Sequence, residues 1–261
     1  MTDEDTDPTT FSLDGRTAVV TGGTRGIGKA ISLGLAEAGA DVVPVSRTRT
    51  DVESAVQAVR DRGADSIVET LDVTDEDEIR TVLSRTAAEL GGIDVVVNNA
   101  GVNPDGALGR PEDVDSSSFE FVVDVNLEGA FTTAAVAGEW LTDSRAGSLI
   151  NVASVGGLVG LPRQHPYVAS KHGMVGMTKS MALDWAPDVR VNAIAPGYVA
   201  TELTEELYEN ESLRSSIEDR TPMDRWAEPS EIAAPAVFLA SDAASYVTGT
   251  VLTVDGGWTA R

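Results

Sequence analysis

Short apolar runs rich in β-branched residues alternate with segments of helical periodicity along almost the whole chain. The apolar runs occupy residues 17–23, 40–46, 66–73, 93–100, 148–154, 189–196 and 249–257. The helical segments between them occupy residues 26–39, 51–62, 75–90, 115–142, 166–186, 204–219 and 229–240. Each apolar run is nearly continuous, which is typical of a parallel strand buried on both faces. The pattern predicts an α/β protein with a doubly wound parallel sheet of about seven strands and helices on both faces.

The length of 261 residues fits one domain of this kind, and no linker, low-complexity run or short repeat divides it. The first residues, MTDEDTDPTT, contain neither a basic region nor an apolar run, so they do not resemble a signal peptide. We expect residues 1–12 to form an acidic, flexible tail and residues 13–261 to form the folded domain. No stretch is apolar for long enough to cross a membrane, so we expect a cytoplasmic protein without a membrane partner.

The chain is strongly acidic, with 42 acidic and 19 basic residues and a net charge of −23. This charge disfavours nucleic acids and anionic membranes as partners. Acidity can accompany disorder, but 42% hydrophobic residues and regular apolar periods argue against that interpretation here. Three lysines against sixteen arginines, with abundant carboxylates, resemble proteins of halophiles that accumulate salt, which screens the repulsion between acids. We therefore expect a halophilic protein.

The chain has no cysteine and only two histidines, His165 and His172. This composition excludes disulfides, thiolate metal sites and a cysteine nucleophile, and two histidines alone do not form a typical zinc site. We expect no metal. We interpret both histidines as ordinary loop and helix-surface residues, although His165 is close enough to Tyr167 in sequence for contact with a substrate.

A glycine-rich turn joins the first predicted strand to the first predicted helix. Its sequence is Thr21-Gly22-Gly23-Thr24-Arg25-Gly26-Ile27-Gly28. Glycines allow close approach of the backbone to a pyrophosphate, and the N-terminus of the following helix supplies free N–H groups. A glycine turn can also merely connect two elements, but its place between a strand and a helix favours dinucleotide binding. The turn therefore indicates a Rossmann-type sheet.

A tyrosine and a lysine four residues apart, Tyr167 and Lys171, lie in the predicted helix 166–186. Residues at this spacing share a helix face. A fixed ammonium favours the phenolate and can lower the tyrosine pKa from about 10 by about 1–3 units, which suits proton exchange with a carbonyl or carbinol oxygen. Lysine suits the role because it is a compact donor, unlike the planar arginine. Ser154, at the preceding strand end, would stabilise charge on the reacting oxygen.

The spacing TGxxxGxG in the glycine turn is similar to that of the short-chain dehydrogenase/reductase family, and further family motifs follow in order. Asn98-Asn99-Ala100-Gly101 resembles the family's NNAG motif, VNLEG contains Asn126, and Tyr167 with Lys171 matches YxxxK. Asp72 lies at the end of the third apolar run. Pro196 is the last residue of the sixth run, and Gly197 follows it. The resemblance covers about residues 13–257, and the sequence is identified as a member of this family.

The resemblance implies a catalytic set and a cofactor site. The catalytic set would be Asn126, Ser154, Tyr167 and Lys171, in which Lys171 also binds the nicotinamide ribose and Asn126 holds a water that links Lys171 to solvent. Asp72 would lie beside the adenine. The expected cofactor-binding residues are Gly22, Thr24, Arg25, Gly26, Ile27, Gly28, Ser46, Arg47, Asp72, Val73, Asn99, Ala100, Gly101, Tyr167, Lys171, Pro196, Gly197, Val199 and Thr201.

The end of the second predicted strand distinguishes NAD from NADP. An acid there binds the adenine ribose of NAD, whereas a nearby base accommodates the 2′-phosphate of NADP. This strand ends Val45-Ser46-Arg47-Thr48 without an acid, and Arg25 adds a second base in the glycine turn. Either arginine alone can be an ordinary surface residue, but two at these positions suit a phosphate. The predicted cofactor is NADP(H), with NAD(H) as the alternative.

The segment of about residues 198–226 is the predicted substrate lid, although most of its charges suit a solvated helix. The runs TPMDRWAEPSEI and VDGGWTAR resemble family members such as gluconate 5-dehydrogenase and 2-deoxygluconate 3-dehydrogenase. We therefore expect hydride transfer between the cofactor and a secondary alcohol or ketone of a sugar, sugar acid or polyol. Arg163, Arg220 or Arg225 could receive a sugar-acid carboxylate.

Two alternatives stand beside this prediction. A 3-oxoacyl-thioester reductase, acting on acyl carrier protein or CoA substrates, shares the same motifs, but a chain at −23 has little basic surface for an acidic carrier protein. A catalytically inactive binding protein of this fold would not need the intact catalytic set, and turnover of any carbonyl compound with NADPH would exclude it. The resemblance also implies a homotetramer, with which the apolar stretches in 115–142 and 235–254 are compatible.

Overall fold

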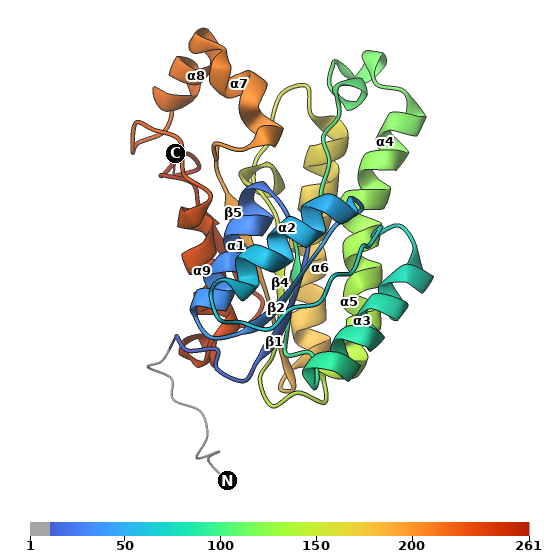
Figure 1. The fold of residues 1–261 in the computed structure, drawn as a ribbon. Coiled ribbons are helices and arrows are strands. Elements are labelled where there is room, and N and C mark those ends of the chain that lie inside the picture. Colours follow the sequence, from blue (N-terminus) through green and yellow to red (C-terminus); the bar gives the residue numbers. More distant parts are fainter. Residues whose placement is uncertain (1–10, 261) are drawn as a thin grey trace.

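The computed structural model describes residues 11–260, and a six-stranded parallel sheet lies at its centre (Figure 1). The predicted tail falls mainly on residues 1–10, outside the described residues. The strands are β1 Thr17–Thr21, β2 Asp41–Val45, β3 Val95–Asn98, β4 Gly147–Val152, β5 Val189–Pro196 and β6 Val251–Val254. Their order, β2-β1-β3-β4-β5-β6, runs outward in both directions from β1. This is the predicted doubly wound arrangement.

Helices cover both faces of the sheet. They are α1 Gly26–Glu37, α2 Arg49–Arg60, α3 Glu76–Leu90, α4 Ser116–Val123, α5 Gly129–Leu141, α6 His165–Trp185, α7 Glu205–Glu209, α8 Glu211–Glu218 and α9 Ser230–Ala240. Asp75 caps α3, since its carboxylate accepts hydrogen bonds from the backbone N–H groups of Asp77 and Glu78.

Alternate residues of β3 show how the sheet is buried on both sides. Val95 and Val97 belong to one fully buried cluster, with Ile31 of α1 among its members. Val96 belongs to the other, with Leu83 of α3. The strand is therefore apolar at every position because each face meets a different helical layer.

The seventh strand, predicted over residues 66–73, is not formed. The segment runs beside β2, but the two make only one isolated parallel bridge, Ser46 with Thr70. At the start of the segment, the Ser66 hydroxyl donates to the Val42 carbonyl at 2.6 Å. In a regular strand pair, this carbonyl would accept a hydrogen bond from a backbone N–H of the neighbouring strand. The side chain thus competes with the backbone ladder at this edge of the sheet.

Two predicted helices are interrupted. The long helix 115–142 contains a π-helical turn, Asp124–Glu128, between α4 and α5. The lid helix 204–219 is divided into α7 and α8 at Asn210, whose side-chain oxygen accepts a hydrogen bond from the backbone N–H of Leu213 and so caps α8. Polar local bonding therefore ends one helix and starts the next.

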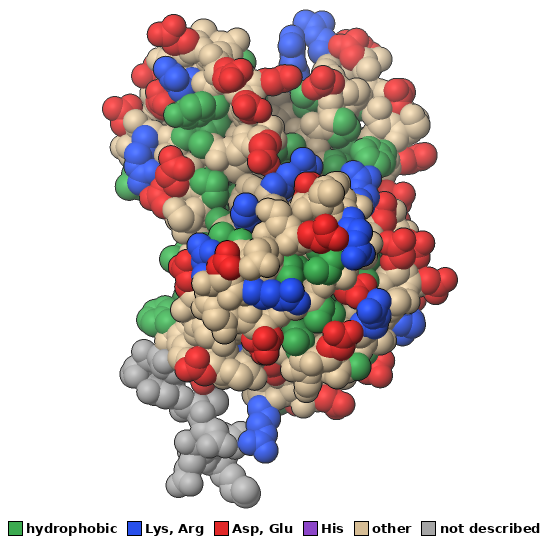
Figure 2. All heavy atoms as spheres, viewed as in Figure 1, with side chains coloured by type: hydrophobic (Ala, Val, Ile, Leu, Met, Phe, Trp, Pro, Cys, Tyr) green, Lys and Arg blue, Asp and Glu red, His purple; other side chains and the backbone are tan. Residues whose placement is uncertain are grey.

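The carboxyl ends of the strands form the functional end of the molecule. Helices α7 and α8 stand on one side of this end and α4 on the other (Figure 1). The space-filling view shows the surface hollowed between them, with acidic side chains on both rims (Figure 2). No helix within residues 11–260 is long and apolar enough to span a membrane.

Candidate active site

The glycine turn is held in place by the loop that follows β3. The side-chain amide of Asn99 donates to the carbonyls of Thr21 and Gly22, each at 3.0 Å. In return, the Thr21 hydroxyl accepts from the backbone N–H groups of Asn99 and Ala100 at 3.0 and 3.1 Å. The two motifs that the sequence placed 77 residues apart therefore form one hydrogen-bonded unit at the carboxyl edge of β1 and β3.

Gly22 and Gly28 cannot be replaced without moving this unit. Gly22 has a φ of +63°, and a Cβ on Gly28 would lie 2.1 Å from the Gly22 carbonyl oxygen. The first turn of α1 has neither a side-chain cap nor an acidic residue. Its N–H groups and its positive dipole end are thus available to an anion, which fits the pyrophosphate of a dinucleotide.

The predicted catalytic residues meet at the next strand end. Ser154 follows β4, and Tyr167 and Lys171 lie one turn apart near the start of α6. The Ser154 hydroxyl accepts from the backbone N–H of Gly156 at 3.0 Å, and it lies close enough to the Tyr167 phenol to lower the pKa of that phenol by hydrogen bonding. The buried Lys171 ammonium donates to the carbonyl of Val152 at 2.7 Å and lies 5.7 Å from the centre of the Tyr167 ring.

The electrostatics of Tyr167 differ from the sequence prediction. Burial raises the pKa of the Tyr167 phenol, while the hydrogen bond with Ser154 opposes the rise. The expected lowering by Lys171 is absent because the ammonium is directed at the Val152 carbonyl rather than at the phenol oxygen. Burial without an acidic partner also lowers the pKa of Lys171 from 10.5 to about 8. Lys171 therefore has a proton that it can lose near neutral pH.

Asn126 lies in the π-helical turn and is fully buried. Its side-chain oxygen accepts from the N–H of Val102 at 2.7 Å, and its amide donates to the Val102 carbonyl at 2.9 Å and to the Ser170 hydroxyl at 3.3 Å. Ser170 in turn donates to the carbonyl of Tyr167. Asn126 thus connects the loop after β3 to the helix that carries Tyr167 and Lys171, and a π-turn is a common place for such a residue.

The end of β2 carries an unpaired polar atom. The Ser46 hydroxyl oxygen is buried and has no hydrogen-bond partner among residues 11–260. Arg47 beside it is exposed and lies 3.9 Å from a carboxylate oxygen of Asp72. Partial burial raises the pKa of Asp72, but hydrogen bonds from Thr74 and the Arg47 charge outweigh it and hold the pKa below its usual value. A buried hydroxyl and a nearby guanidinium fit a phosphorylated ribose.

The other predicted cofactor residues surround the same strand ends. Thr201 lies over the glycine turn, because a Cβ on Gly26 would come within 3.4 Å of it. Gly197 donates its N–H to the Val254 carbonyl at 3.0 Å. Among these predicted residues, the buried ones are Thr24, Gly28, Val73, Pro196 and Val199. Arg25 is exposed, and the half-buried residues are Gly22, Gly26, Ile27, Asn99 and Ala100. Gly101 is exposed.

A cluster of aromatic rings lies under the lid, and sequence reasoning did not identify it. Tyr198 meets Trp226 at 5.3 Å and Trp258 at 5.7 Å between ring centres, and Tyr208 meets Trp226 at 5.4 Å. All three pairs have edge-to-face geometry, which is the favoured one. The indole N–H groups of Trp226 and Trp258 are buried and unpartnered within the described part of the chain.

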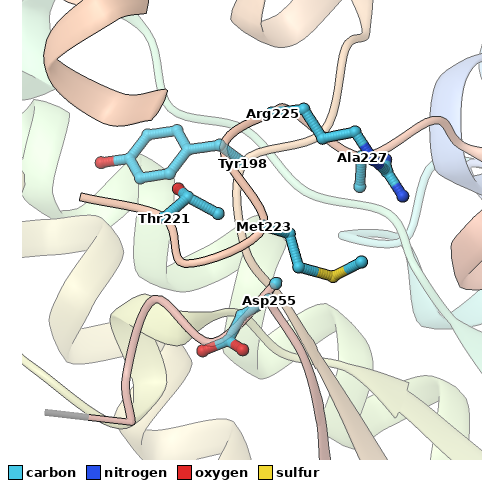
Figure 3. Close-up of a pocket in the computed structure, with 7 residues that line it drawn as sticks. Tyr198, Thr221, Met223, Arg225, Ala227 and Asp255 are labelled. Carbon is cyan, nitrogen blue, oxygen red and sulfur yellow. The ribbon is translucent and has the colours of Figure 1, made fainter. Parts of the chain in front are cut away.

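A small cavity adjoins this cluster (Figure 3). Tyr198, Thr221, Met223, Arg225 and Ala227 line it together with Asp255 and Gly256 of the C-terminal segment. Neither Ser154 nor Tyr167 lines it. We therefore regard it as packing space between the lid and the C-terminal segment.

The fold and this site define a class of protein: a Rossmann-fold oxidoreductase built to place a nicotinamide dinucleotide across the carboxyl ends of β1 and β3. The family model described as enoyl-(acyl carrier protein) reductase matches residues 22–259. The chain is 40% identical over 256 residues to the 2-dehydro-3-deoxy-D-gluconate 5-dehydrogenase of Escherichia coli, covering 96% of this chain and 98% of that one. It is 39% identical over 246 residues to the 3-oxoacyl-[acyl-carrier-protein] reductase FabG of Thermotoga maritima, covering 94% and 98%.

Among solved structures, the fold is similar to that of a gluconate 5-dehydrogenase from Burkholderia cenocepacia in complex with NADP and tartrate. The TM-score is 0.92 at 34% identity, and the match covers 97% of this chain and 99% of that one. The chain belongs to the short-chain dehydrogenase/reductase family. It is an oxidoreductase that uses a nicotinamide cofactor.

Proposed function

We propose that this protein is an NADP(H)-preferring dehydrogenase acting on a secondary alcohol or ketone of a sugar acid, sugar or polyol. The observation that carries the proposal is the placement of Ser154 beside Tyr167, with the buried Lys171 ammonium 5.7 Å from the Tyr167 ring centre, at the carboxyl edge of the sheet. Bound NADP(H) supplies or accepts the hydride. The chain's own residues supply the proton in reduction, accept it in oxidation, and stabilise the reacting oxygen.

In this proposal Tyr167 exchanges the proton with the substrate oxygen, and Ser154 hydrogen-bonds the same oxygen. Lys171, which here donates to the Val152 carbonyl, would bind the nicotinamide ribose, and its charge would then favour the phenolate. Asn126 fixes the Val102 loop against α6 and so positions the pair. With a pKa of about 8, Lys171 can pass a proton onward near neutral pH.

The preference for NADP(H) is supported by the end of β2. The Ser46 hydroxyl, which has no hydrogen-bond partner in the described part of the chain, and the exposed Arg47 and Arg25 offer three donor groups to a 2′-phosphate. The Burkholderia cenocepacia relative is described with NADP. Replacing Ser46 with Asp and Arg47 with a neutral residue should shift the preference toward NAD. A wild type that prefers NAD by tenfold would contradict the proposal.

The substrate class is supported by the relatives named for gluconate derivatives. The second candidate is 3-oxoacyl-thioester reduction, because the Thermotoga maritima relative carries that name at nearly equal identity. The two candidate functions differ in the substrate that the protein must bind. An acyl carrier protein is acidic, and the visible face of this molecule carries basic side chains scattered among acids rather than a basic patch (Figure 2).

The test is a turnover panel in molar KCl with NADP(H) and NAD(H). It compares sugar acids, their neutral polyols and 3-oxoacyl thioesters. We expect kcat/KM to be highest for a sugar acid or polyol. Higher kcat/KM for the thioesters would establish the alternative, and no turnover of any carbonyl compound would favour an inactive binding protein.

We also propose a cytoplasmic, salt-adapted homotetramer. The acidic surface supports the salt adaptation. Phe121 of α4 and Phe131 of α5 are 42% and 53% exposed, Leu183 of α6 is 84% exposed, and all three would be covered by a neighbouring copy. Sedimentation in molar KCl gives the mass, and a monomer would contradict the assembly.

A further inference from the structure

The polar groups around the lid differ in whether other groups of the protein already engage them. Arg225 forms a two-point ion pair with Glu231, with both N–O distances at 2.7 Å. The guanidinium carbon of Arg220 lies 4.9 Å from the centre of the Trp258 ring. Two of the three arginines predicted to receive a carboxylate are thus engaged within the chain. The hydroxyl of Tyr198, by contrast, has no hydrogen-bond partner in the part of the protein that the structure describes.

The backbone at Tyr198 is fixed from both sides. The N–H of Gly197, the residue before it, donates to the Val254 carbonyl at 3.0 Å. The carbonyl of Tyr198 itself accepts from the N–H of Ala227 at 2.9 Å. A Cβ on Gly197 would lie 2.8 Å from the Cα of Asp255, so the chain that leads into Tyr198 runs directly against the C-terminal segment. The residue therefore has little freedom to move as a unit.

The ring of Tyr198 is fixed as well. Trp226 and Trp258 both meet it edge to face, with ring centres at 5.3 and 5.7 Å. Trp226 is itself only 5% exposed, so the ring rests on a buried support. The phenol points away from Met223 and Arg225, which line the small cavity under the lid (Figure 3). These contacts hold the hydroxyl in one place and leave it without a partner.

Tyr198 lies at the same edge of the sheet as the reacting residues. Strands β4 and β5 are paired as far as the residue before Ser154, where the Ala153 N–H donates to the Ile194 carbonyl at 2.8 Å. Ser154 and Tyr198 therefore follow neighbouring strands, which lie about 4.8 Å apart. Burial raises the pKa of Tyr167, and Tyr198 adds to that rise. The two phenols are thus close enough to interact.

The Tyr198 phenol is suited to bind a hydroxyl group. Burial raises its pKa, and the nearby Arg220 charge only partly opposes that rise, so the phenol keeps its proton at neutral pH. A protonated phenol both donates and accepts hydrogen bonds, and a substrate hydroxyl does the same. A half-buried hydroxyl without a protein partner gains its hydrogen bond only from a ligand or from water.

We propose that the Tyr198 hydroxyl binds the substrate hydroxyl on the carbon next to the reacting carbon, and so selects hydroxy ketones and polyols over simple ketones and alcohols. The inference rests on the proposed function. In this arrangement Ser154 and Tyr167 bind the reacting oxygen, and Tyr198 binds the oxygen beside it. A simple ketone leaves Tyr198 without a partner and therefore binds more weakly.

The test compares the NADPH-dependent reduction of 1-hydroxy-2-propanone and 2-butanone, in which a methyl group replaces the hydroxyl next to the carbonyl carbon. For Tyr198→Phe we expect kcat/KM for the hydroxy ketone to fall about 2- to 13-fold, mainly through KM, the effect of losing one neutral hydrogen bond. We expect kcat/KM for 2-butanone, the NADPH Kd and the thermal midpoint to stay within error. Tyr208→Phe removes the hydroxyl of the other tyrosine in the aromatic cluster. It is the matched control and should leave the ratio of the two ketones unchanged.

Equal losses of kcat/KM on both ketones, or none on either, would overturn the role of Tyr198 and leave the proposed function standing. A loss confined to 3-oxoacyl thioesters would also overturn it, because the group bound by Tyr198 would then be a thioester carbonyl.

A binding measurement separates this inference from the proposed function. D-glucitol is titrated into the NADP⁺-saturated wild type, Tyr198→Phe and Tyr208→Phe, and tryptophan fluorescence is recorded because Trp226 and Trp258 contact Tyr198. We expect the glucitol Kd to rise in Tyr198→Phe alone. That result without turnover of any carbonyl compound would overturn the proposed function and retain the hydroxyl site. Without turnover, equal glucitol affinity in all three proteins, or no binding, would overturn both.

Discussion

The strand-end half of the site and the lid are built by different kinds of contact. At the ends of β1 and β3, backbone and side-chain hydrogen bonds of 3.0–3.1 Å join Thr21, Gly22, Asn99 and Ala100 into one rigid unit. The lid consists of short helices with exposed Leu203, at 61%. Edge-to-face ring pairs hold it together with backbone hydrogen bonds near its ends, such as that from the Ala227 N–H to the Tyr198 carbonyl. Hydrogen bonds between two loops dominate at the strand ends, whereas ring contacts contribute much of the packing under the lid.

The largest effect expected in the strand-end half of the site is that of a substitution at Tyr167. Tyr167→Phe keeps the ring and removes the hydroxyl that meets Ser154. General acid–base catalysis is worth about 10²–10⁴-fold, so kcat should fall by at least that range while NADPH affinity and the thermal midpoint stay within error. Steady-state kinetics with NADPH titration checks this. A variant that keeps more than a tenth of the wild-type kcat would show that Tyr167 is only a packing residue.

Lys171, in the strand-end half of the site, allows a test based on the free energy of unfolding. Its folded-state pKa of about 8 lies below the unfolded 10.5, so the folded protein binds fewer protons between these values. The wild-type free energy of unfolding should therefore gain up to about 3 kcal/mol from this group as pH rises from about 8 to 10.5, with the penalty fully present below pH 8. Lys171→Met should lack that gain. Lys179→Met, on the exposed side of α6, is the matched control.

Urea unfolding at pH 7, 8, 9 and 10.5 measures the difference between Lys171→Met and wild type. We expect the variant to have its largest relative stability at pH 7 and to lose it by pH 10.5. A difference that does not change with pH would mean that Lys171 has an ordinary pKa in the folded protein.

The two halves also differ in how far the sequence predicts them. The glycine turn, Asn99 and the Tyr167–Lys171 spacing could be predicted because each depends on a local backbone constraint or on one helical turn. Gly28 is an example, since any side chain there would collide with the Gly22 carbonyl. The aromatic cluster could not be predicted, because Tyr198, Trp226 and Trp258 are brought together only by the tertiary fold.

Other differences arise where side-chain hydrogen bonds between segments distant in sequence accompany a departure from regular secondary structure. The predicted strand 66–73 is apolar enough for the sheet, yet the Ser66 hydroxyl occupies the acceptor that a ladder needs. Periodicity places Asn126 in a regular helix, whereas its three hydrogen bonds accompany a π-turn. The predicted pKa lowering at Tyr167 assumed that Lys171 faces the phenol, and rotamer choice cannot be inferred from spacing.

Gly28→Ala tests whether the strand-end half of the site excludes a side chain at residue 28. The new methyl would lie 2.1 Å from the Gly22 carbonyl oxygen and 2.3 Å from the Asn99 amide nitrogen, so the turn must shift. Overpacking of this kind costs about 1–3 kcal/mol. We expect the NADPH Kd to rise at least tenfold and the thermal midpoint to fall. Gly176→Ala in α6 is the control, because nothing lies within 4 Å of its added methyl, and helix propensity should make it neutral or slightly stabilising.

Salt should have a smaller effect, concentrated in the lid. The carboxylates of α7 and α8 repel one another over a Debye length of about 30 Å at 0.01 M salt, which shortens to about 3 Å at 1 M. Each exposed pair is worth only a few tenths of a kcal/mol, so amide hydrogen exchange in 205–218 should slow severalfold between dilute buffer and molar KCl. Exchange in the buried β3 should change less, because its protection comes from packing and ladder bonds. The thermal midpoint should rise over the same range. Equal slowing in both regions would mean that KCl acts on the whole fold, and no slowing would mean that the acidity of the lid has another cause, such as contact with a basic partner.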